Sequence, residues 1–449
     1  MRIHLIACGG AVMHNMTIAL KQLGHEVTGS DDEIYDPAKS RLKEHGLLPD
    51  FGWNTERITK NIDVIILGMH AKQDNPELLK ALELGIKVVS YPEYLYELSK
   101  NKKRVVIGGS HGKTSITSMV LHVLQYHNQD FDYMVGAQIE GFDTMVKITD
   151  APLIILEGDE YLASPLDRRP KFHLYKADIA VLTGIAWDHV NVFPTFENYV
   201  EQFEIFIDSL ADEAKLFTFQ GDEILEKIRN RNKKIFSSNY NSIEHKIENG
   251  YTSIVLDGKD YPINIFGSHN MQNLQAAQHI CIEIGLSPMQ FVEAIQHFTG
   301  AAKRLDLLAE SPKNVVYKDF AHSPSKLKAT VSAMKEQFPS RTLVGCMELH
   351  TFSSLTKSFL KEYKGAMDAC DEAIVFINKR YFEIKNLEAF SENDVKAGFE
   401  REDLKVYFDA EELKNELNRN QWDNSNLLLM SSGNFGNIDL QEIANKVVQ

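Results

Sequence analysis

Short runs of apolar, often β-branched residues recur along this chain, and most of them end at a glycine or a polar turn. Near-continuous apolar runs of this length are typical of strands that are buried on both faces of a parallel sheet. Stretches with helical character, such as Ile116–Gln125, separate the runs. The pattern therefore predicts an α/β fold with strands at Ile3–Ala7, Glu26–Asp31, Asp63–Gly68, Val88–Ser90, Val105–Ile107, Leu153–Glu157, Ile179–Thr183, Val315–Lys318, Thr342–Met347, Ala373–Ile377 and Leu427–Met430.

These elements fall into three blocks, and a length of 449 residues agrees with about three domains of ~150 residues each. We predict a Rossmann-like N-terminal domain over 1–100, a central P-loop ATPase domain with a mainly parallel sheet over 101–300, and a Rossmann-like C-terminal domain over 301–449. The basic run Lys100–Arg104 is interpreted as a solvated hinge between the first two. Residues Asp208–Asp260 are more polar, which indicates an irregular or antiparallel insertion.

The strand at Val105–Ile107 leads into a glycine turn and then into a helix, which is the arrangement of a phosphate-binding loop. Lys113 would neutralise the β- and γ-phosphates, and the Thr114 hydroxyl would bind Mg²⁺. Position 107 is isoleucine rather than the usual first glycine, so the loop is a shortened variant. The chain is therefore predicted to bind a nucleoside triphosphate through Gly109, Ser110, His111, Gly112, Lys113, Thr114 and Ser115.

Two further strands of the second block end in residues capable of chemistry. Leu153–Glu157 ends at a carboxylate, and Ile179–Thr183 leads to Asp188 and His189. Ligands gather at the carboxyl ends of parallel strands, so Glu157 and His189 would approach the same Mg²⁺ region. A carboxylate is a natural magnesium ligand, whereas imidazole is less usual, and a histidine such as His189, taken alone, is more often a helix-start or core residue.

Two other segments carry weaker signals. Cys8–Met13 is a glycine turn after the first strand, but it lacks the full fingerprint of a dinucleotide site, so a nicotinamide site is an alternative that it does not favour. Asn270 and Asn273 lie three residues apart on one helical face. Their amides would either cap the helix or contact a nucleotide base, and the spacing alone favours capping.

The overall composition restricts the class of protein. A formal charge of −15 argues against partners such as nucleic acid or an anionic membrane surface that bind through bulk electrostatics. The four cysteines have no metal-like or disulfide-like spacing, which indicates reduced, buried thiols in a cytoplasmic protein. The N-terminus enters a strand directly, without a signal-peptide pattern, and no apolar run reaches the ~20 residues of a membrane span.

The order of these motifs resembles the Mur ligase family over essentially the whole chain. The resemblance rests on Gly109–Thr114, Glu157–Tyr161, Asp188-His189, Gly267–Asn273, Lys303-Arg304 and Asp319–Pro324. It implies an ATP- and Mg²⁺-dependent ligase that forms an amide bond through an acyl phosphate. The segments Gly24–Asp31, Leu166–Phe172 and Met430–Gly436 are similar to members that join the tripeptide L-Ala-γ-D-Glu-meso-diaminopimelate to UDP-N-acetylmuramate in peptidoglycan recycling. The alternative within the family is a biosynthetic member that adds L-alanine.

The resemblance also implies residue roles. Thr114 and Glu157 would hold one magnesium ion and His189 a second, while Arg304, beside Lys303, would meet the γ-phosphate or acyl phosphate. Asn270, Asn273, Asp319 and His322 would contact ATP. The UDP-sugar would lie against Gly9, Gly10, Ser30, Asp31 and His70. We expect a monomer or weak homodimer.

The chain departs from the family pattern in places that concern the acceptor. The first member of the basic pair is Lys303 rather than arginine, and Lys318 stands where an aspartate is common. The tripeptide ligases tend to have Glu-Pro-Arg-Ser-Asn-Thr in the third domain, whereas this chain has Glu348–Ser354 with His350 at the arginine position. Two other classes remain as alternatives: a dehydrogenase, which leaves the Gly-Lys-Thr run unexplained, and a regulatory P-loop ATPase, which leaves the first domain without a role.

Overall fold

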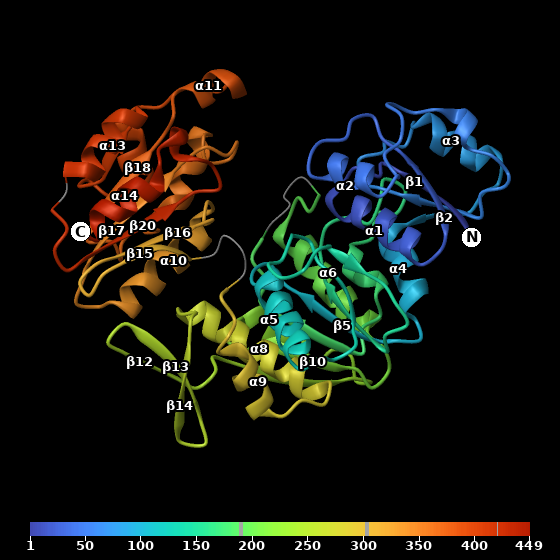
Figure 1. The fold of residues 1–449 in the computed structure, drawn as a ribbon, viewed down its shortest axis with the longest axis horizontal. Helices are drawn as coiled ribbons and strands as arrows, with labels where there is room; N and C mark the ends of the chain where they lie inside the picture. The colour runs from blue at the N-terminus through green and yellow to red at the C-terminus, as the bar shows by residue number, and fades with distance from the viewer. Residues whose placement is uncertain (188–191, 301–304, 420) are drawn as a thin grey trace. The chain divides into compact units, whose positions relative to one another are not determined.

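A computed structural model describes residues 1–187, 192–300, 305–419 and 421–449 (Figure 1). Contacts divide the chain into two compact units. Unit 1 comprises Met1–Ile243 and Gln272–Ile295, and unit 2 comprises Glu244–Met271 and Gln296–Gln449. Both units combine parallel strands with helices, so the predicted α/β fold class is confirmed.

Unit 1 begins with a parallel sheet whose four strands run in the order β2-β1-β3-β4. Pro76 stands at the first turn of a helix behind the N-cap Asn75, as its position in the sequence predicts. The strands are β1 (Arg2–Ile6), β2 (Glu26–Ser30), β3 (Val64–Leu67) and β4 (Val88–Ser90). The helices of this part are α1 (Ala11–Gln22), α2 (Ala38–Glu44), η1 (Thr55–Arg57), α3 (Pro76–Glu83) and α4 (Tyr91–Ser99).

A second sheet of unit 1 has the strand order β11-β10-β9-β5-β8-β6-β7, and only the β6–β7 pair is antiparallel. Its strands are β5 (Lys103–Gly108), β6 (Asp132–Met134), β7 (Val146–Lys147), β8 (Leu153–Glu157), β9 (Ile179–Leu182), β10 (Lys215–Phe219) and β11 (Phe236–Tyr240). Its helices are α5 (Lys113–Tyr126), η2 (Lys171–Leu174), α6 (Phe196–Ser209), α7 (Glu223–Ile228), α8 (Ser268–Glu283, which continues from unit 2) and α9 (Pro288–Ile295). Strands β8 and β9 flank β5, so all three bring their carboxyl ends to one edge.

Part of the predicted insertion belongs to this sheet. Strands β10 and β11 pair in parallel with β9 and with each other, so the prediction for Asp208–Asp260 is wrong over its first half. The polar, partly exposed residues of β11 reflect its position at the edge of the sheet. The second half is antiparallel as predicted, in the strands β12 (His245–Glu248), β13 (Tyr251–Leu256) and β14 (Lys259–Ile263) of unit 2.

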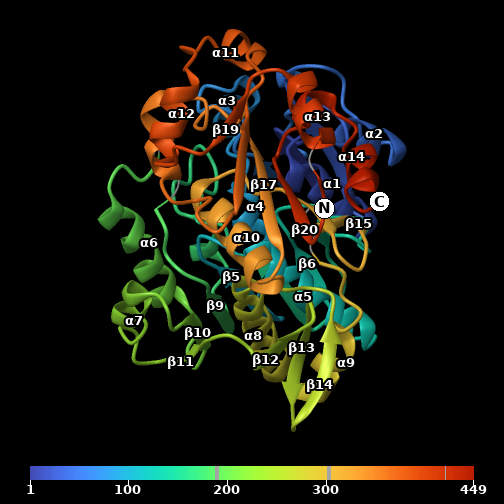
Figure 2. The same cartoon turned by 90° about the vertical axis from the view of Figure 1, so that its left-hand side faces the viewer.

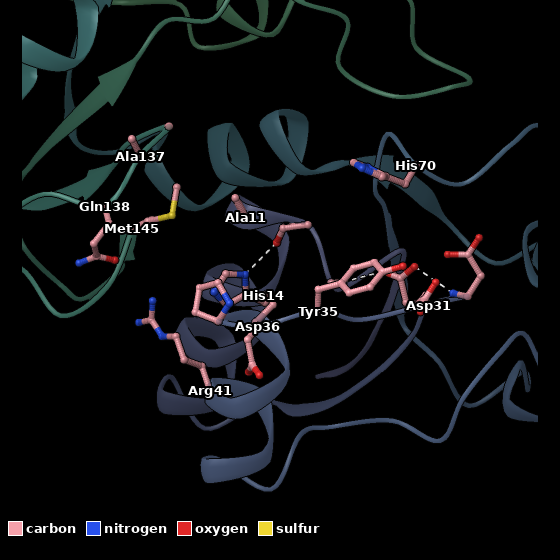
Figure 3. Close-up of a pocket in the computed structure, with 17 residues that line it drawn as sticks. Ala11, His14, Asp31, Tyr35, Asp36, Arg41, His70, Ala137, Gln138 and Met145 are labelled. Carbon is pink, nitrogen blue, oxygen red and sulfur yellow. Dashed lines mark hydrogen bonds between the residues drawn. The ribbon is translucent and has the colours of Figure 1, made fainter. Parts of the chain in front are cut away.

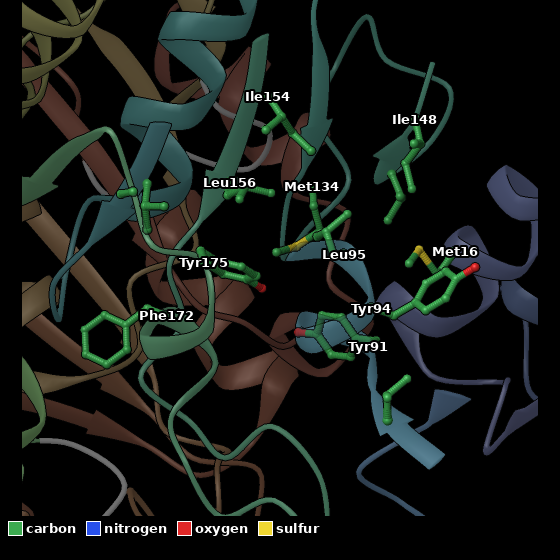
Figure 4. Close-up of a cluster of buried hydrophobic side chains, with 14 of the residues drawn as sticks. Met16, Tyr91, Tyr94, Leu95, Met134, Ile148, Ile154, Leu156, Phe172 and Tyr175 are labelled. Atoms are coloured by element: carbon green, nitrogen blue, oxygen red, sulfur yellow. The ribbon is translucent and has the colours of Figure 1, made fainter. Parts of the chain in front are cut away.

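One hydrophobic core serves both sheets of unit 1 (Figure 4). Tyr91, Tyr94 and Leu95 of α4 are buried in the same cluster as Met134 and Leu156 of the larger sheet. Figure 4 shows these side chains converging from the two parts of the chain. The apolar surface that drives folding is therefore shared between them, which explains why residues 1–243 cluster as a single unit.

The basic run between these two parts is not a solvated hinge. Arg104 is 7% exposed; it pairs with Asp178 at 3.1 Å and donates to the carbonyls of Ser99, Lys100, Lys102 and Lys176. Lys102 donates to the fully buried Asp132 at 2.6 Å. The partners lie about 30 and 74 residues further along the chain, so the local sequence gave no sign of them. The solvated-hinge interpretation is therefore wrong for Lys102 and Arg104, which burial and ion pairing hold in place, whereas Lys100, Asn101 and Lys103 are exposed.

Unit 2 contains a six-stranded sheet in the order β15-β16-β20-β17-β18-β19, in which only β15 is antiparallel. Its strands are β15 (Asp306–Glu310), β16 (Val315–Asp319), β17 (Thr342–Glu348), β18 (Glu372–Phe376), β19 (Lys405–Tyr407) and β20 (Ser425–Met430). Its helices are α10 (Pro324–Gln337), η3 (Lys357–Tyr363), α11 (Arg380–Lys385), α12 (Glu392–Phe399), α13 (Ala410–Arg419), η4 (Phe435–Asn437) and α14 (Leu440–Val447).

Alternate residues of these strands face two separate cores, as the pleat of a strand requires. Met347 and Leu428 belong to the core that α10 and α12 cover, whereas Cys346 and Leu429 belong to the core that α13 and α14 cover. Figure 2 shows the two pairs of helices on opposite sides of β17 and β20. Both faces are buried, which accounts for the near-continuous apolar runs in this part of the sequence.

The four cysteines are buried and unpaired, as predicted. Burial raises the pKa of Cys8 and Cys370 to about 12, so both stay protonated thiols at neutral pH. In the ranges that the structure covers, no helix has both the length and the apolarity to cross a membrane.

We expect Arg104→Ala to lower the free energy of unfolding by about 2–3 kcal/mol, because it removes the guanidinium that pairs with Asp178 and leaves several carbonyls without this donor; Asp178 keeps only the N–H of residue 104. Lys100→Ala is the matched control, since it removes only the exposed pair with Glu97 and should cost no more than about 0.5 kcal/mol. Urea unfolding followed by circular dichroism measures both. Equal, small losses would restore the solvated-hinge interpretation.

Candidate active site

The turn between β5 and α5 has the backbone that a phosphate-binding loop needs. Gly109 (φ +118°) and Gly112 (φ +79°) both adopt left-handed conformations that favour glycine. A Cβ on Gly109 would clash with Thr183 of the neighbouring strand end, and one on Gly112 would clash with the Asn273 side chain. Gly112 is also the N-cap of α5 and has no side chain to cap it. The first backbone N–H groups of α5 are therefore offered to a ligand, where the helix dipole favours an anion.

Lys113, the first residue of α5, is held by two oxygens. Its Nζ donates to the Gly109 carbonyl at 2.6 Å and to Glu160 Oε2 at 2.8 Å. The Lys113 side chain is 15% exposed and that of Glu160 is 1% exposed. Burial alone would lower the pKa of Lys113, but the charge and hydrogen bond of Glu160 outweigh it and raise the pKa above its ordinary value. The lysine is therefore a fixed positive charge.

Thr114 and Glu157 meet beside this lysine. The Thr114 hydroxyl donates to Glu157 Oε1 at 3.0 Å, and the Gly136 N–H donates to Glu157 Oε2 at 3.2 Å. A Cβ on Gly136 would stand 2.9 Å from Glu157 Oε1, so the approach needs a glycine. Burial raises the pKa of Glu157, and the hydrogen bonds and Lys113 offset this only in part. The ionised carboxylate therefore lacks a full counter-charge.

These two residues fit a magnesium ion. A hydroxyl and a carboxylate are hard oxygen donors, and magnesium usually keeps several waters, so two protein ligands are enough. The cation would also supply the counter-charge that Glu157 lacks. Across the described ranges, no group of three or more His, Cys, Asp and Glu side chains is arranged to hold a metal.

A second ion pair lies next to Glu157 in the sequence. Asp159 accepts from Lys171, whose ammonium stands over the rings of Tyr91 (5.9 Å) and Tyr161 (5.6 Å). Burial would raise the pKa of Asp159, but Lys171 and a backbone N–H reverse this and lower it. The sequence motif pointed to Glu157 alone; the roles of Glu160 and Asp159 depend on lysines that are 47 and 12 residues away.

Three of the predicted residues, His189, Lys303 and Arg304, lie outside the described residues. The segment leading toward His189 is nevertheless attached to the phosphate loop. The Ala186 N–H donates to Ser110 Oγ at 2.8 Å, and Ser110 Oγ donates to the Ala186 carbonyl at 2.9 Å. The segment after β9 therefore lies against the phosphate loop at Ala186, as expected if β9 ends at the same edge of the sheet as that loop.

The structure separates the two asparagines of α8. Asn273 lies against Gly112 of the phosphate loop, where its amide is in reach of a nucleotide. Asn270 donates to the Phe266 carbonyl at 2.8 Å, which engages its amide in local backbone contacts.

In unit 2, Asp319 is buried and accepts from the N–H groups of Ala321 (2.7 Å) and Leu305 (2.8 Å). His322 Nδ1 bonds to the Phe320 carbonyl at 2.9 Å.

A cavity of about 770 Å³ opens at the carboxyl ends of the first sheet (Figure 3). Gly9, Gly10, Asp31 and His70 line it, as predicted for a sugar-nucleotide site. Its other lining residues are Ala11, His14, Asp32, Glu33, Tyr35, Asp36, Pro37, Ala38, Arg41, Gly136, Ala137, Gln138 and Met145. The N-terminus of α1 and Arg41 would suit a diphosphate group, and the volume suits a ligand of nucleotide size.

Two predicted residues of this region have other partners. Ser30 is buried and donates to Glu77, and it is not among the residues that line the cavity. The Gly9 N–H donates to Asp31 Oδ2 at 2.6 Å, so Asp31 both lines the cavity and fixes the glycine turn. Burial raises the pKa of Asp31 despite this bond.

The expected acceptor loop of unit 2 starts from a buried carboxylate. Glu348 is fully buried at the end of β17, where its Oε2 accepts from the Phe435 N–H at 2.9 Å and from Ser431 Oγ. His350 bonds to Ser432 at 3.2 Å, and burial lowers its pKa. A Cβ on Gly433 would stand 2.6 Å from Glu348 Oε2. The loop after β20, which contains Gly433, therefore packs tightly on the end of β17.

Comparisons with known proteins agree with this geometry. The family descriptions "Mur ligase family, catalytic domain" and "Mur ligase middle domain" match residues 2–103 and 107–281. The chain is 30% identical to a UDP-N-acetylmuramate–L-alanine ligase of Sulfurihydrogenibium sp., over 83% of this chain and 82% of that protein. The solved murein peptide ligase of Neisseria meningitides is 24% identical, with a TM-score of 0.61 over 66% of this chain and 98% of that one. A UDP-N-acetylmuramate–alanine ligase of Thermotoga maritima is 19% identical, with a TM-score of 0.67 over 100% of this chain and 98% of that one.

We expect Gly112→Ala to lower the affinity for ADP at least tenfold, because the new Cβ displaces Asn273 or tilts the start of α5. Isothermal titration calorimetry measures this affinity. Gly85→Ala is the control: it imposes the same backbone strain of roughly 1–2 kcal/mol at a position with no atom within 4 Å, and it should bind ADP normally. Equal affinities in both variants would mean that the loop does not contact the nucleotide.

Glu157→Gln and Asp159→Asn should change the free energy of unfolding in opposite directions at pH 8. The raised pKa of Glu157 makes its ionised form costly, so the glutamine variant gains stability; the gain shrinks as the pH falls toward the ordinary value of 4.5, where the wild-type carboxyl is also protonated. The lowered pKa of Asp159 means that its ionised form stabilises the fold, so the asparagine variant loses about 1–3 kcal/mol.

The loss in the Asp159 variant should persist at pH 5 and close only below its ordinary value of 3.8. Urea unfolding at several pH values, without metal or nucleotide, measures both effects. A change of the same sign in both variants at pH 8 would contradict this electrostatic description.

Proposed function

We propose a specific reaction from the premise that this chain belongs to the Mur ligase family and is an ATP-dependent ligase that forms amide bonds. In this reaction, the enzyme joins L-Ala-γ-D-Glu-meso-diaminopimelate to the lactyl carboxylate of UDP-N-acetylmuramate. The reaction would serve peptidoglycan recycling in the cytoplasm. The proposal is carried by two contacts that lie together at the carboxyl edge of one sheet: the Lys113–Glu160 ion pair and the Thr114–Glu157 hydrogen bond. The same unit contains a cavity large enough for a nucleotide sugar.

The acceptor is the part of the proposal that rests on motifs. The segments Leu166–Phe172 and Met430–Gly436 resemble those of murein peptide ligases, and two solved murein peptide ligases share the fold. The second candidate is a UDP-N-acetylmuramate–L-alanine ligase, which the curated relatives favour. His350, in place of the arginine of the peptide ligases, is one of several residues in Glu348–Ser354 that depart from their pattern.

We assign the ATP phosphates to the loop Gly109–Ser115, with Lys113 as their principal cation. Thr114 and Glu157 would hold a magnesium ion, which neutralises phosphate charge when bound. Asn273 would contact the nucleotide from α8. The further assignments are His189 to a second magnesium ion, Arg304 to the transferred phosphate, Asn270, Asp319 and His322 to ATP, and Gly9, Gly10, Ser30, Asp31 and His70 to the UDP-sugar.

The chemistry requires activation, because a carboxylate and an amine do not condense in water. One carboxylate oxygen of the sugar attacks the γ-phosphorus of ATP, which gives an acyl phosphate and ADP. The amine of the acceptor then attacks the acyl carbon, loses a proton, and expels inorganic phosphate from the tetrahedral intermediate. Each step moves negative charge near the phosphate loop, so the contribution of Lys113 is charge neutralisation and positioning rather than covalent catalysis.

We expect phosphate release with ATP, Mg²⁺ and UDP-N-acetylmuramate to depend on the tripeptide and not on L-alanine, and Lys113→Ala to reduce it at least a hundredfold while the fold is kept. A coupled phosphate assay and mass spectrometry of the product measure both. Turnover with L-alanine alone would establish the second candidate. Near-normal ligation by Lys113→Ala would contradict the ATP site.

A further inference from the structure

The phosphate-loop lysine already has an anionic partner inside the protein. Glu160 Oε2 lies 2.8 Å from Lys113 Nζ, and the Glu160 side chain is 1% exposed. An ammonium group has three N–H donors, and the Gly109 carbonyl takes a second of them at 2.6 Å. A phosphate that approaches this loop therefore meets a lysine whose charge is already neutralised.

A hydrogen-bonded network holds Glu160 in this position. Its Oε1 accepts from the Tyr199 hydroxyl at 3.1 Å, and Tyr199, a fully buried residue of α6, lies 3.0 Å from the hydroxyl of Ser110. Ser110 is itself part of the phosphate loop and exchanges hydrogen bonds with Ala186. The carboxylate is thus connected to the phosphate loop twice, through Lys113 at one oxygen and through Tyr199 and Ser110 at the other.

This arrangement distinguishes Glu160 from its neighbours. Glu157 carries the Thr114 contact, and Asp159 is neutralised by Lys171, so neither is paired to Lys113. Among the described side chains of the Glu157–Glu160 segment, only Glu160 forms an ion pair with Lys113. A buried carboxylate whose partner is withdrawn keeps its charge only if other donors remain, and the Tyr199 hydroxyl is such a donor.

We propose that Glu160 is a positioning residue that competes with nucleotide phosphate for Lys113. In the empty loop it holds the lysine; when ATP binds, the ammonium transfers its hydrogen bond from Glu160 to a phosphate oxygen, and Glu160 stays bonded to Tyr199. No covalent bond or proton changes place in this exchange. The inference rests on the proposed ATP site and adds that part of the phosphate affinity is used to break the Lys113–Glu160 pair.

The test is the affinity for ADP of Glu160→Gln, measured by isothermal titration calorimetry without a second substrate. The amide keeps the shape of the side chain but removes its charge, so the competing ion pair is lost and we expect a Kd about tenfold lower than in the wild-type protein. The KM for ATP should fall with it, whereas kcat should not rise. An unchanged or higher Kd would overturn the proposal, because Glu160 would then be neutral or supportive toward the nucleotide.

Two controls make the result specific. Glu283→Gln removes a lysine–glutamate pair on the surface of the same unit, with Lys215, and should leave the Kd unchanged. Tyr199→Phe keeps the Lys113–Glu160 pair but removes the donor that supports Glu160 after the exchange, so its Kd should rise, opposite to the effect of Glu160→Gln. A tenfold change in the Glu283 variant, or a Kd that falls in the Tyr199 variant, would overturn the assignment of the effect to the charge of Glu160.

A third variant covers the case in which Glu160→Gln does not fold. Glu160→Asp keeps the charge but shortens the reach to Lys113, and we expect its Kd to fall about threefold; no change or a rise would overturn the proposal. The proposed function fails separately: if the wild-type protein binds no ADP, or if Lys113→Ala binds it equally well, the ATP site itself is wrong. A wild-type protein that binds ADP, together with a Glu160 variant of unchanged affinity, removes only the competition.

Discussion

The carboxyl end of β8 concentrates negative charge on two buried carboxylates, Glu157 and Glu160, and on the partly exposed Asp159 between them, and much of the candidate site depends on how that charge is neutralised. Glu157, Asp159 and Glu160 follow one another within four residues, and among the described residues Lys171 and Lys113 neutralise the last two. Among the residues that the structure describes, Glu157 has hydrogen bonds but no ion pair, and burial raises its pKa. A cation bound there would complete the balance. The type of ligand that magnesium prefers and the missing counter-charge therefore both indicate Glu157 as the residue that binds the cation.

The position of the site follows from the sequence because parallel sheets leave little choice. A glycine turn after Val105–Ile107 and a carboxylate after Leu153–Glu157 have to meet if the two strands are neighbours, and the structure pairs β5 directly with β8. The side-chain partners were less accessible. Glu160 and Asp159 differ from Glu157 only by their place in a loop, and the lysine that each one meets depends on side-chain directions that no sequence pattern specifies.

The same limit explains the errors in the fold. Lys100–Arg104 has the composition of an exposed linker, and only the carboxylates of Asp132 and Asp178, brought in by folding, make it part of the interior. Strand β11 was missed because its edge position leaves it polar enough to resemble an insertion. Strand β10 is an inner, mostly buried strand that was missed because the segment around it is polar. By contrast, β17, β18 and β20 are buried on both faces, so their apolar runs predicted them closely. The sequence therefore predicts well where burial is complete, and poorly where charge is buried by distant partners.

The hydrophobic core shared by the two sheets of unit 1 has a consequence for how this protein can be taken apart. Tyr91, Tyr94 and Leu95 are buried in one cluster with Met134 and Leu156 of the larger sheet. A fragment cut near residue 100 would expose aromatic surface on both pieces. The cavity beside Asp31 also takes Gly136–Gln138 and Met145 from beyond that cut. The first hundred residues are therefore not an independent module. Exchanging them for those of another protein would also require redesign of the buried surface that they share with the larger sheet.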